Sequence, residues 1–231
     1  MKFLNNVNSI LLVFAHPDDE VLACGGLIAK FSKDIEFNLI FISEGDSCRF
    51  EDYKNNKAFE AIHKERTEAS YTAAKLLGIN EVKHLNYPCG RLDSINIIDI
   101  NKKIEEMINS YNPQLIITHF LDDNNNDHRI VSRSVHMAAR PVFEHDISIM
   151  EAEVLSSTDW NYSNTFSPNL FVKLSDEDIE IKKNALKCYD KEIRSKPHSR
   201  SSYGIEALSR YRGLCIGHEF AEGYILKRHF L

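Results

Sequence analysis

Short apolar runs alternate with amphipathic segments through the first half of the chain. The runs have the length and the β-branched or aromatic content of buried strands, and they occupy residues 10–15, 37–42, 82–85 and 115–118. Between them apolar residues repeat at helical spacing, which predicts helices over residues 20–32, 58–77 and 97–111. Because strands that alternate with helices pair in parallel through right-handed crossovers, we predict an α/β fold with a mostly parallel sheet flanked by helices.

The last third of the chain has a less regular pattern. Short strands are predicted at residues 154–157, 170–174 and 224–226, and helices at residues 176–189 and 204–211. Two adjacent glycines, Gly25 and Gly26, stand inside the first predicted helix and predict that it lies close against the sheet or the substrate. No internal repeat or linker is evident, so we interpret residues 1–231 as a single domain.

Composition and charge argue against several classes of protein. The chain has 231 residues, 43% of them hydrophobic, which suffices for one sizeable core. A net charge of −6 without a basic block argues against a nucleic-acid or anionic-membrane binder. The apolar runs are too short for a signal-peptide core or a membrane span. Five scattered cysteines without a CxxC pair are interpreted as small buried hydrophobes, so we expect a reducing, cytoplasmic location.

The first predicted strand ends in a compact polar group, His16-Pro17-Asp18-Asp19-Glu20. Ligands of open parallel sheets bind beyond the carboxyl ends of the strands, which is where this group is expected to lie. His16 and Asp19 are three residues apart, a spacing at which an imidazole and a carboxylate can converge on one metal ion. The alternative is that the acidic residues only cap the following helix, where the helix dipole favours them.

A second polar group, residues 119–128, follows the strand at residues 115–118 and contains two histidines and three aspartates. Since both groups follow strands of one parallel sheet, they meet at its carboxyl edge, which favours a shared metal site over two separate helix caps. The predicted ligands are His16, Asp19 and His128, with a position left open for water as in catalytic zinc sites; iron(II) would also fit. Asp18 stays free to take a proton from that water.

These motifs resemble those of the PIG-L/LmbE-like zinc-dependent N-deacetylases. The resemblance covers most of the chain and rests on residues 15–20, Cys24-Gly25-Gly26, Thr118-His119 and residues 123–128, with further matches at Arg66, Arg212-Gly213 and Ala221-Glu222. It implies a Rossmann-like fold, zinc on the three predicted ligands, and two catalytic aspartates: Asp18 as the general base and Asp127 supporting a metal ligand. It also implies hydrolysis of the N-acetyl group of a GlcNAc-type sugar in glycan, nucleotide-sugar or thiol biosynthesis.

Two stretches away from the metal ligands have alternative interpretations. Arg66 is predicted to meet the substrate or the developing oxyanion, and the alternative is a helix-surface arginine paired with Glu65 or Glu68. Trp160 and Tyr162 lie in a Ser/Asn-rich stretch. They are interpreted as core or loop hydrophobes, and the alternative is a platform on which a sugar ring stacks.

Two positions depart from the family pattern. Asn125 stands where several relatives have a histidine; its amide can donate a hydrogen bond to an oxyanion but cannot deliver a proton. Proton return to the amine therefore falls to Asp18, or to His119 if that side chain faces the site. Cys89 stands where relatives tend to have an aspartate, and Arg91 is the residue expected to bind the sugar instead.

Several alternatives of function stay open at this point. The same site could cleave a larger amide or a thiol conjugate, or the protein could bind a sugar or a nucleotide without catalysis. Nucleotide binding is disfavoured because no G-x-G-x-x-G follows a predicted strand. The expected partner is a small N-acetylated sugar, with no nucleic acid and no membrane span, and a homo-oligomer is compatible with the sequence.

Overall fold

A seven-stranded sheet forms the centre of the computed structural model, which describes Leu4 and residues 7–141 and 146–230. Its strand order is β3-β2-β1-β4-β5-β7-β6. Five strands pair in parallel: β1 (Ser9–Phe14), β2 (Glu36–Ser43), β3 (Glu81–Tyr87), β4 (Leu115–His119) and β5 (Ser148–Ala152). β7 (Phe220–Arg228) is antiparallel to both β5 and β6 (Leu170–Leu174). The predicted mostly parallel sheet is confirmed.

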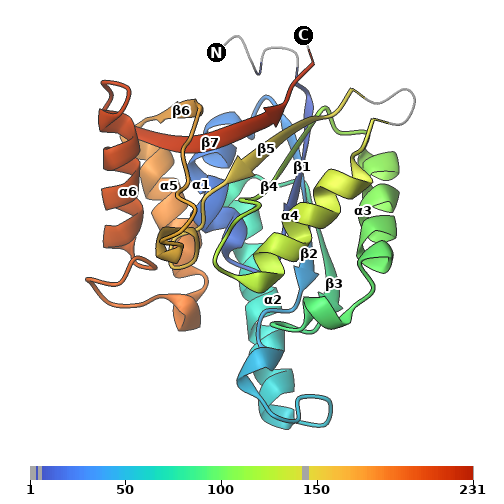
Figure 1. Ribbon diagram of the computed structural model, residues 1–231. Coiled ribbons are helices and arrows are strands. Elements are labelled where there is room, and N and C mark those ends of the chain that lie inside the picture. The colour runs from blue at the N-terminus through green and yellow to red at the C-terminus, as the bar shows by residue number, and fades with distance from the viewer. Residues whose placement is uncertain (1–3, 5–6, 142–145, 231) are drawn as a thin grey trace.

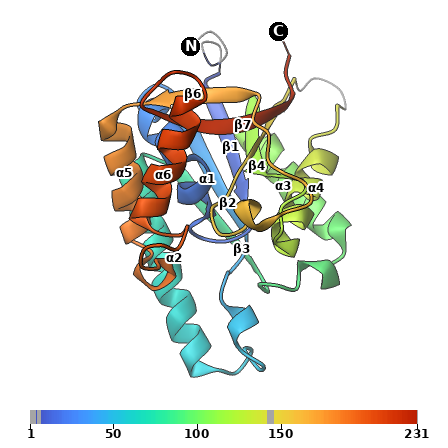
Figure 2. The same ribbon diagram turned by 60° about the vertical axis from the view of Figure 1, so that its left-hand side comes forward.

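Helices cover both faces of the sheet (Figures 1 and 2). One face carries α1 (Asp19–Phe31), α2 (Lys57–Leu77), α5 (Asp176–Lys187) and α6 (Ser202–Leu214), and the other carries α3 (Ile97–Tyr111) and α4 (Asn126–Ala138). Alternate residues of β1 serve the two cores: Leu12 and Phe14 pack on the α1 side, Leu11 and Val13 on the α3 side. Because both faces are covered, the strand is apolar throughout, which is why its sequence pattern predicted it.

The helices begin and end close to their predicted limits, with local reasons in the sequence. For α2, the Asn56 side chain accepts hydrogen bonds from the amides of Ala58 and Phe59, and Gly78 closes the helix at a φ of 83°. Across the described residues, no helix is long and apolar enough to span a membrane.

The strand predicted at residues 154–157 is wrong, because the fifth strand lies earlier, at Ser148–Ala152. Its buried Glu151, which pairs with His136 at 2.8 Å, made that segment look too polar for a central strand. Val154 instead begins a turn: its amide donates to Thr158 Oγ1 at 2.8 Å, and its carbonyl accepts from the Thr158 amide at 2.9 Å. These local bonds satisfy backbone groups that a strand would pair across the sheet.

A buried carboxylate accepts hydrogen bonds from the backbone amides that follow a break in α1. The helix is interrupted at Cys24, whose φ and ψ are −142° and 20°. Glu222 of β7 accepts hydrogen bonds from the amides of Gly26 and Leu27 beyond the break, at 2.8 and 2.7 Å, and Lys182 neutralises it at 2.7 Å. A Cβ on Gly26 would lie 2.4 Å from a leucine side chain of β6. The predicted close packing of this helix against the sheet is confirmed.

Replacing Glu222 with glutamine is expected to destabilise the protein by about 3–5 kcal/mol, because it leaves the buried Lys182 ammonium without its counter-charge. Lys182 and Glu222 are 3% and 5% exposed, so solvent cannot substitute for the lost partner. Urea unfolding followed by circular dichroism measures the change. Glu180→Gln is the matched control, since it breaks an exposed ion pair with Lys183 on α5 and is expected to cost less than about 1 kcal/mol. Equal losses for the two variants would contradict the prediction.

Candidate metal centre

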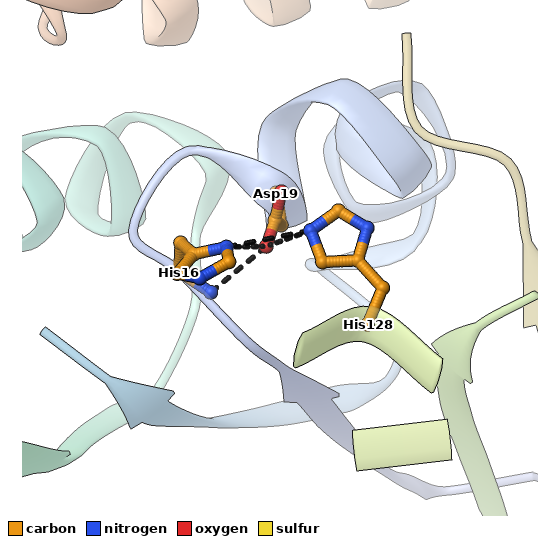
Figure 3. Close-up of side chains that lie close together, drawn as sticks. All are labelled: His16, Asp19 and His128. Atoms are coloured by element: carbon orange, nitrogen blue, oxygen red, sulfur yellow. Dashed lines mark hydrogen bonds and ion pairs between the residues drawn. The ribbon is translucent and has the colours of Figure 1, made fainter. Parts of the chain in front are cut away.

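The polar groups that follow β1 and β4 meet at the carboxyl edge of the sheet. The two strands are direct neighbours, so the turns behind them lie side by side. His16 lies in the turn between β1 and α1, and Asp19 is the first residue of α1. His128 lies in the first helical turn of α4. Figure 3 shows the three side chains converging, with the Asp19 carboxylate between the two imidazole rings. The structure therefore brings together all three predicted ligands.

Three donor atoms form a nearly equilateral triangle. Asp19 Oδ2 lies 3.3 Å from His16 Nδ1 and 3.4 Å from His128 Nε2, and these two nitrogens are 3.3 Å apart. Tetrahedral zinc with bonds of 2.0–2.1 Å places its ligand atoms about 3.3 Å from one another, so the triangle has the size of one face of a zinc site. All three residues are buried. Two imidazoles and one carboxylate suit zinc, and they also suit Fe²⁺.

Asp19 and His128 each lie beside groups of opposite charge, which stabilise their charged forms. Burial would raise the pKa of Asp19, but His128 and His119 beside it hold that pKa well below its usual value. Burial would likewise lower the pKa of His128, but Asp19 and Asp123 raise it to about 10. A metal needs the neutral imidazole, so a cation held here would take the place of the proton on His128. Metal affinity is therefore expected to fall as the pH is lowered.

Each candidate histidine ligand contacts a carboxylate through its other nitrogen. His16 Nε2 lies 3.1 Å from Asp127 Oδ2, and Asp127 is itself held by the amides of Gly90 at 2.6 Å and Leu92 at 3.3 Å. His128 Nδ1 lies 3.2 Å from Asp123 Oδ1. Such partners fix the orientation of a metal-binding imidazole and raise its basicity.

Asp123 belongs to the motif at residues 123–128, but sequence reasoning assigned it no role in the site. Its carboxylate contacts His128 and also accepts hydrogen bonds from the hydroxyls of Ser157 and Thr158. The Asp/Asn-rich composition of residues 119–128 was the available signal, but it did not show which aspartate would face which histidine. The segment around residues 157–158 is far away in sequence, so this part of the site depends on the fold.

Asp18 has a strained backbone and an unsatisfied carboxylate. Its φ is 111°, a value that non-glycine residues rarely adopt. Both carboxylate oxygens are buried, and neither accepts a hydrogen bond from the residues that the structure describes. The nearest cations are Arg200 Nη1 at 3.2 Å and Arg66 Nη2 at 3.5 Å. Burial raises the pKa of Asp18 above its ordinary value, although both arginines oppose the shift. Backbone strain and a buried carboxylate without a hydrogen-bond partner, next to a ligand set, are typical of functional sites.

Comparison with known proteins places the chain in a family. Residues 11–139, more than half of the chain, match the PIG-L family model, described as GlcNAc-PI de-N-acetylase. The chain belongs to the PIG-L family. Over 227 residues it is 22% identical to the diacetylchitobiose deacetylase of Thermococcus kodakarensis, a match that covers 95% of this chain and 83% of that protein.

Solved structures share the PIG-L fold but differ in chemistry. The N,N′-diacetylchitobiose deacetylase of Pyrococcus horikoshii superposes with a TM-score of 0.76 at 19% identity, covering 97% of this chain and 85% of that one. GalB, the 4-carboxy-2-hydroxymuconate hydratase of Pseudomonas putida, superposes with a TM-score of 0.74 at 18% identity, covering 97% and 98%. The fold therefore does not by itself distinguish hydrolysis from hydration.

Arg66 of this PIG-L protein is buried, so the helix-surface alternative is wrong. Its Nε and Nη2 donate to the Pro17 carbonyl at 3.1 and 2.7 Å, and its Nη1 donates to the Gly45 carbonyl at 2.9 Å and to Asp46 Oδ1 at 3.1 Å. These bonds fix the turn that carries Asp18. Since its donors already have protein partners, Arg66 acts here as a positioning residue, and a direct contact with substrate stays a prediction.

The two other predicted substrate-binding residues also have structural partners. Asn125 Oδ1 caps α4 by accepting a hydrogen bond from the Asp127 amide at 2.9 Å, so a contact between its amide group and an oxyanion stays a prediction. Arg91 donates to the Ser47 carbonyl at 3.3 Å, and its guanidinium lies 5.3 Å from the centre of the Tyr53 ring. Arg91 thus braces the loop after β2, and its contact with a sugar also stays a prediction.

His119 stacks on His128, and its Nδ1 is buried without a hydrogen-bond partner among the residues that the structure describes. The two rings are 3.8 Å apart and nearly parallel, and His119 Nε2 accepts a hydrogen bond from the Ala15 amide at 2.8 Å. Burial and the adjacent His128 hold the pKa of His119 well below its usual value, so the ring is neutral. Return of the proton by Asp18 or by His119 stays a prediction.

Two more residues near Asp18 come from the C-terminal third and were not predicted from the sequence as site residues. Glu192 contacts Arg49, Arg66 and Arg200, at 2.7, 3.3 and 3.3 Å. Glu192 and Arg200 thus belong to a network of ion pairs beside the turn at residues 16–19. Only the fold shows that Arg200 reaches Asp18.

The aromatic residues after β5 are loop residues. Trp160 and Tyr162 are 45% and 89% exposed, so neither belongs to the core. Trp160 contacts the ring of His198 at 5.8 Å, which ties this loop to the segment that carries Arg200. A role in sugar stacking stays a prediction.

Proposed function

We propose that this protein is a metal-dependent hydrolase that removes the N-acetyl group from an N-acetylated amino sugar of the GlcNAc type or from its conjugate. The observation that carries the proposal is the triangle of donor atoms from His16, Asp19 and His128, with the unsatisfied Asp18 carboxylate next to it in the chain. Membership of the PIG-L family and the deacetylase relatives support this chemistry over hydration. The cytoplasm remains the expected location.

The three ligand residues would hold zinc, or another divalent ion such as Fe²⁺. The bound ion supplies Lewis acidity to the amide carbonyl and lets water react as hydroxide near neutral pH. Asp18 takes a proton from the attacking water while the water oxygen forms a bond to the carbonyl carbon. When the C–N bond breaks, Asp18 returns that proton to the nitrogen, and acetate and the free amino sugar leave.

The surrounding residues keep the reacting groups in place. Asp127 and Asp123 orient His16 and His128, so both imidazoles meet an ion with a fixed nitrogen. Arg66 fixes the turn of Asp18 through the Pro17 carbonyl. In this proposal Asn125 Nδ2 donates to the oxyanion, while Arg66 and Arg91 border the bound sugar.

Release of acetate by metal-loaded protein tests the proposal. We expect the Zn²⁺- or Fe²⁺-loaded protein to release acetate from at least one member of a panel of GlcNAc, diacetylchitobiose and α-linked GlcNAc conjugates. A chelator should abolish the release, and added metal should restore it. Fully metal-loaded protein that releases no acetate from the panel would contradict the proposal. Release of only a larger acyl group would favour the amidase alternative, and hydration of 4-carboxy-2-hydroxymuconate would favour the chemistry of the hydratase relative.

A further inference from the structure

Two cysteines from different loops meet beside the metal centre. Cys48 lies in a single 3₁₀ turn (Ser47–Arg49) after β2, and Cys89 lies in the loop after β3. Their Sγ atoms are 3.3 Å apart, and both residues are free thiols. A disulfide bond measures about 2.0 Å, so the sulfur atoms need to approach by little more than about 1 Å to form one.

The backbone holds the two loops face to face. The Cys89 amide donates to Glu44 Oε1 and to Ser47 Oγ, both at 2.9 Å. Gly90 has a φ of +70°, and a Cβ at that position would lie 3.1 Å from the Cys48 Cβ. A side chain at residue 90 would therefore crowd Cys48 in a backbone conformation that favours glycine. The close approach of the two sulfurs is built into the loops and does not depend on side-chain rotation alone.

The two thiols differ in access to solvent. Cys48 is exposed, whereas Cys89 is 6% exposed. The hydrogen bond from the Cys89 thiol, together with Arg49 nearby, lowers the pKa of Cys48 to about 6 although partial burial opposes the shift. A thiolate is the form of cysteine that reacts with oxidants. Cys48 is thus placed as the attacking thiol and Cys89 as the resolving one, which corrects the interpretation of every cysteine as a buried hydrophobe.

Cys89 directly precedes Gly90, whose amide holds the carboxylate that contacts His16. The next amide, that of Gly90, donates to Asp127 Oδ2 at 2.6 Å, and the same oxygen lies 3.1 Å from His16 Nε2. Donor atoms of Cys89, Asp127 and His16 all lie within 4.8 Å of one another. A movement of Cys89 toward Cys48 therefore acts on the hydrogen bond that orients His16.

We propose that Cys48 and Cys89 form a redox switch, in which a Cys48–Cys89 disulfide loosens the metal centre through Gly90, Asp127 and His16. Hydrogen peroxide is the oxidant. The Cys48 thiolate attacks one peroxide oxygen, so that an S–O bond forms, the O–O bond breaks, and the departing hydroxide takes up a proton as water. Cys89 loses its proton and attacks the sulfenic sulfur, so that the S–S bond forms and the S–O bond breaks, and a second water leaves. Two thiols are oxidised by two electrons, and one peroxide becomes two waters.

Oxidation of the Zn²⁺-loaded protein by peroxide tests the switch with two readouts that need no substrate. Non-reducing peptide mapping is expected to show a Cys48–Cys89 cross-link. Competition with a chelator is expected to show a ~10–100-fold loss of zinc affinity, the usual effect of losing a partner of a metal-binding imidazole. Dithiothreitol should reverse both changes. Cys48→Ser should prevent them, whereas Cys215→Ser, which changes an exposed cysteine outside the pair, should not.

Two results would overturn the switch: absence of the cross-link in oxidised wild-type protein, or a cross-link that leaves zinc affinity unchanged. Only the consequence for acetate release rests on the proposed function. If no substrate releases acetate while the cross-link and the loss of zinc affinity are observed, the proposed function fails and the switch stands.

Discussion

Replacing Asp18 with asparagine is expected to lower the rate of acetate release by ~10²–10⁴-fold, the usual contribution of a general base. Asparagine has nearly the same shape as aspartate, but its amide cannot take a proton from water. It also tolerates a positive φ better than most residues, so the strained turn should be kept. Metal content should stay at the wild-type level, because Asp18 is not one of the three ligands. Turnover and metal content of the purified variant are the measurements.

Asp46→Asn is the matched control for Asp18→Asn. Asp46 is also a buried carboxylate that contacts Arg66, with its Oδ1 atom 3.1 Å from Nη1. Its variant removes a negative charge beside the same arginine and leaves the proposed base intact, so a much smaller loss of turnover is expected. Acetate release at the wild-type rate by the Asp18 variant would refute its role as the base. Equal losses of turnover for both variants would indicate that turnover depends on the negative charge around Arg66 and not on proton transfer by Asp18.

Replacing His128 with glutamine is expected to remove the bound metal and, with it, acetate release. The variant takes away one of three donor atoms from a triangle whose sides are 3.3–3.4 Å. It also leaves Asp19 and Asp123 beside each other without the imidazole between them. We expect the loss of metal affinity to exceed the ~10–100-fold that follows from removing an outer partner of a ligand. Metal analysis after dialysis against a weak chelator measures the change.

His136→Gln provides the comparison on the same helix. His136 lies on α4 like His128, but its Nε2 contacts Glu151 at 2.8 Å, away from the ligand triangle. This variant should bind metal at the wild-type level even if it is less stable. Stoichiometric metal in the His128 variant would mean that the ion is held elsewhere, and the proposed centre would have to be abandoned.

The ligand set could be predicted because of where its motifs stand in the sheet. His16 lies in the turn after β1, and His128 lies in the first turn of α4, after the loop that follows β4. Both buried strands were recognisable from their apolar runs alone. In a parallel sheet the ends of neighbouring strands coincide, so a long separation in sequence became a short distance in space. The strand at Ser148–Ala152 was missed because Glu151 is buried within it, and its ionic partners belong to other elements.

Residues whose roles depend on partners from distant segments could not be predicted. Arg66 has the spacing of a helix-surface arginine, and only the packing of α2 beside the turn at Pro17 buries it. Arg200 reaches Asp18 from an irregular segment near the C-terminus, where hydrophobic periodicity carries no signal. The approach of Cys48 to Cys89 likewise depends on how the loops after β2 and β3 face each other.

By itself, the sequence determined the alternation of strands and helices, the parallel sheet and the residues that could ligate a metal, because periodicity and local spacing act over a few residues at a time. Only the tertiary structure decided which carboxylate supports which imidazole, what surrounds Asp18 and which cysteines meet. Those contacts join segments whose relative positions follow from the packing of both faces of the sheet, and nothing within a single segment encodes them.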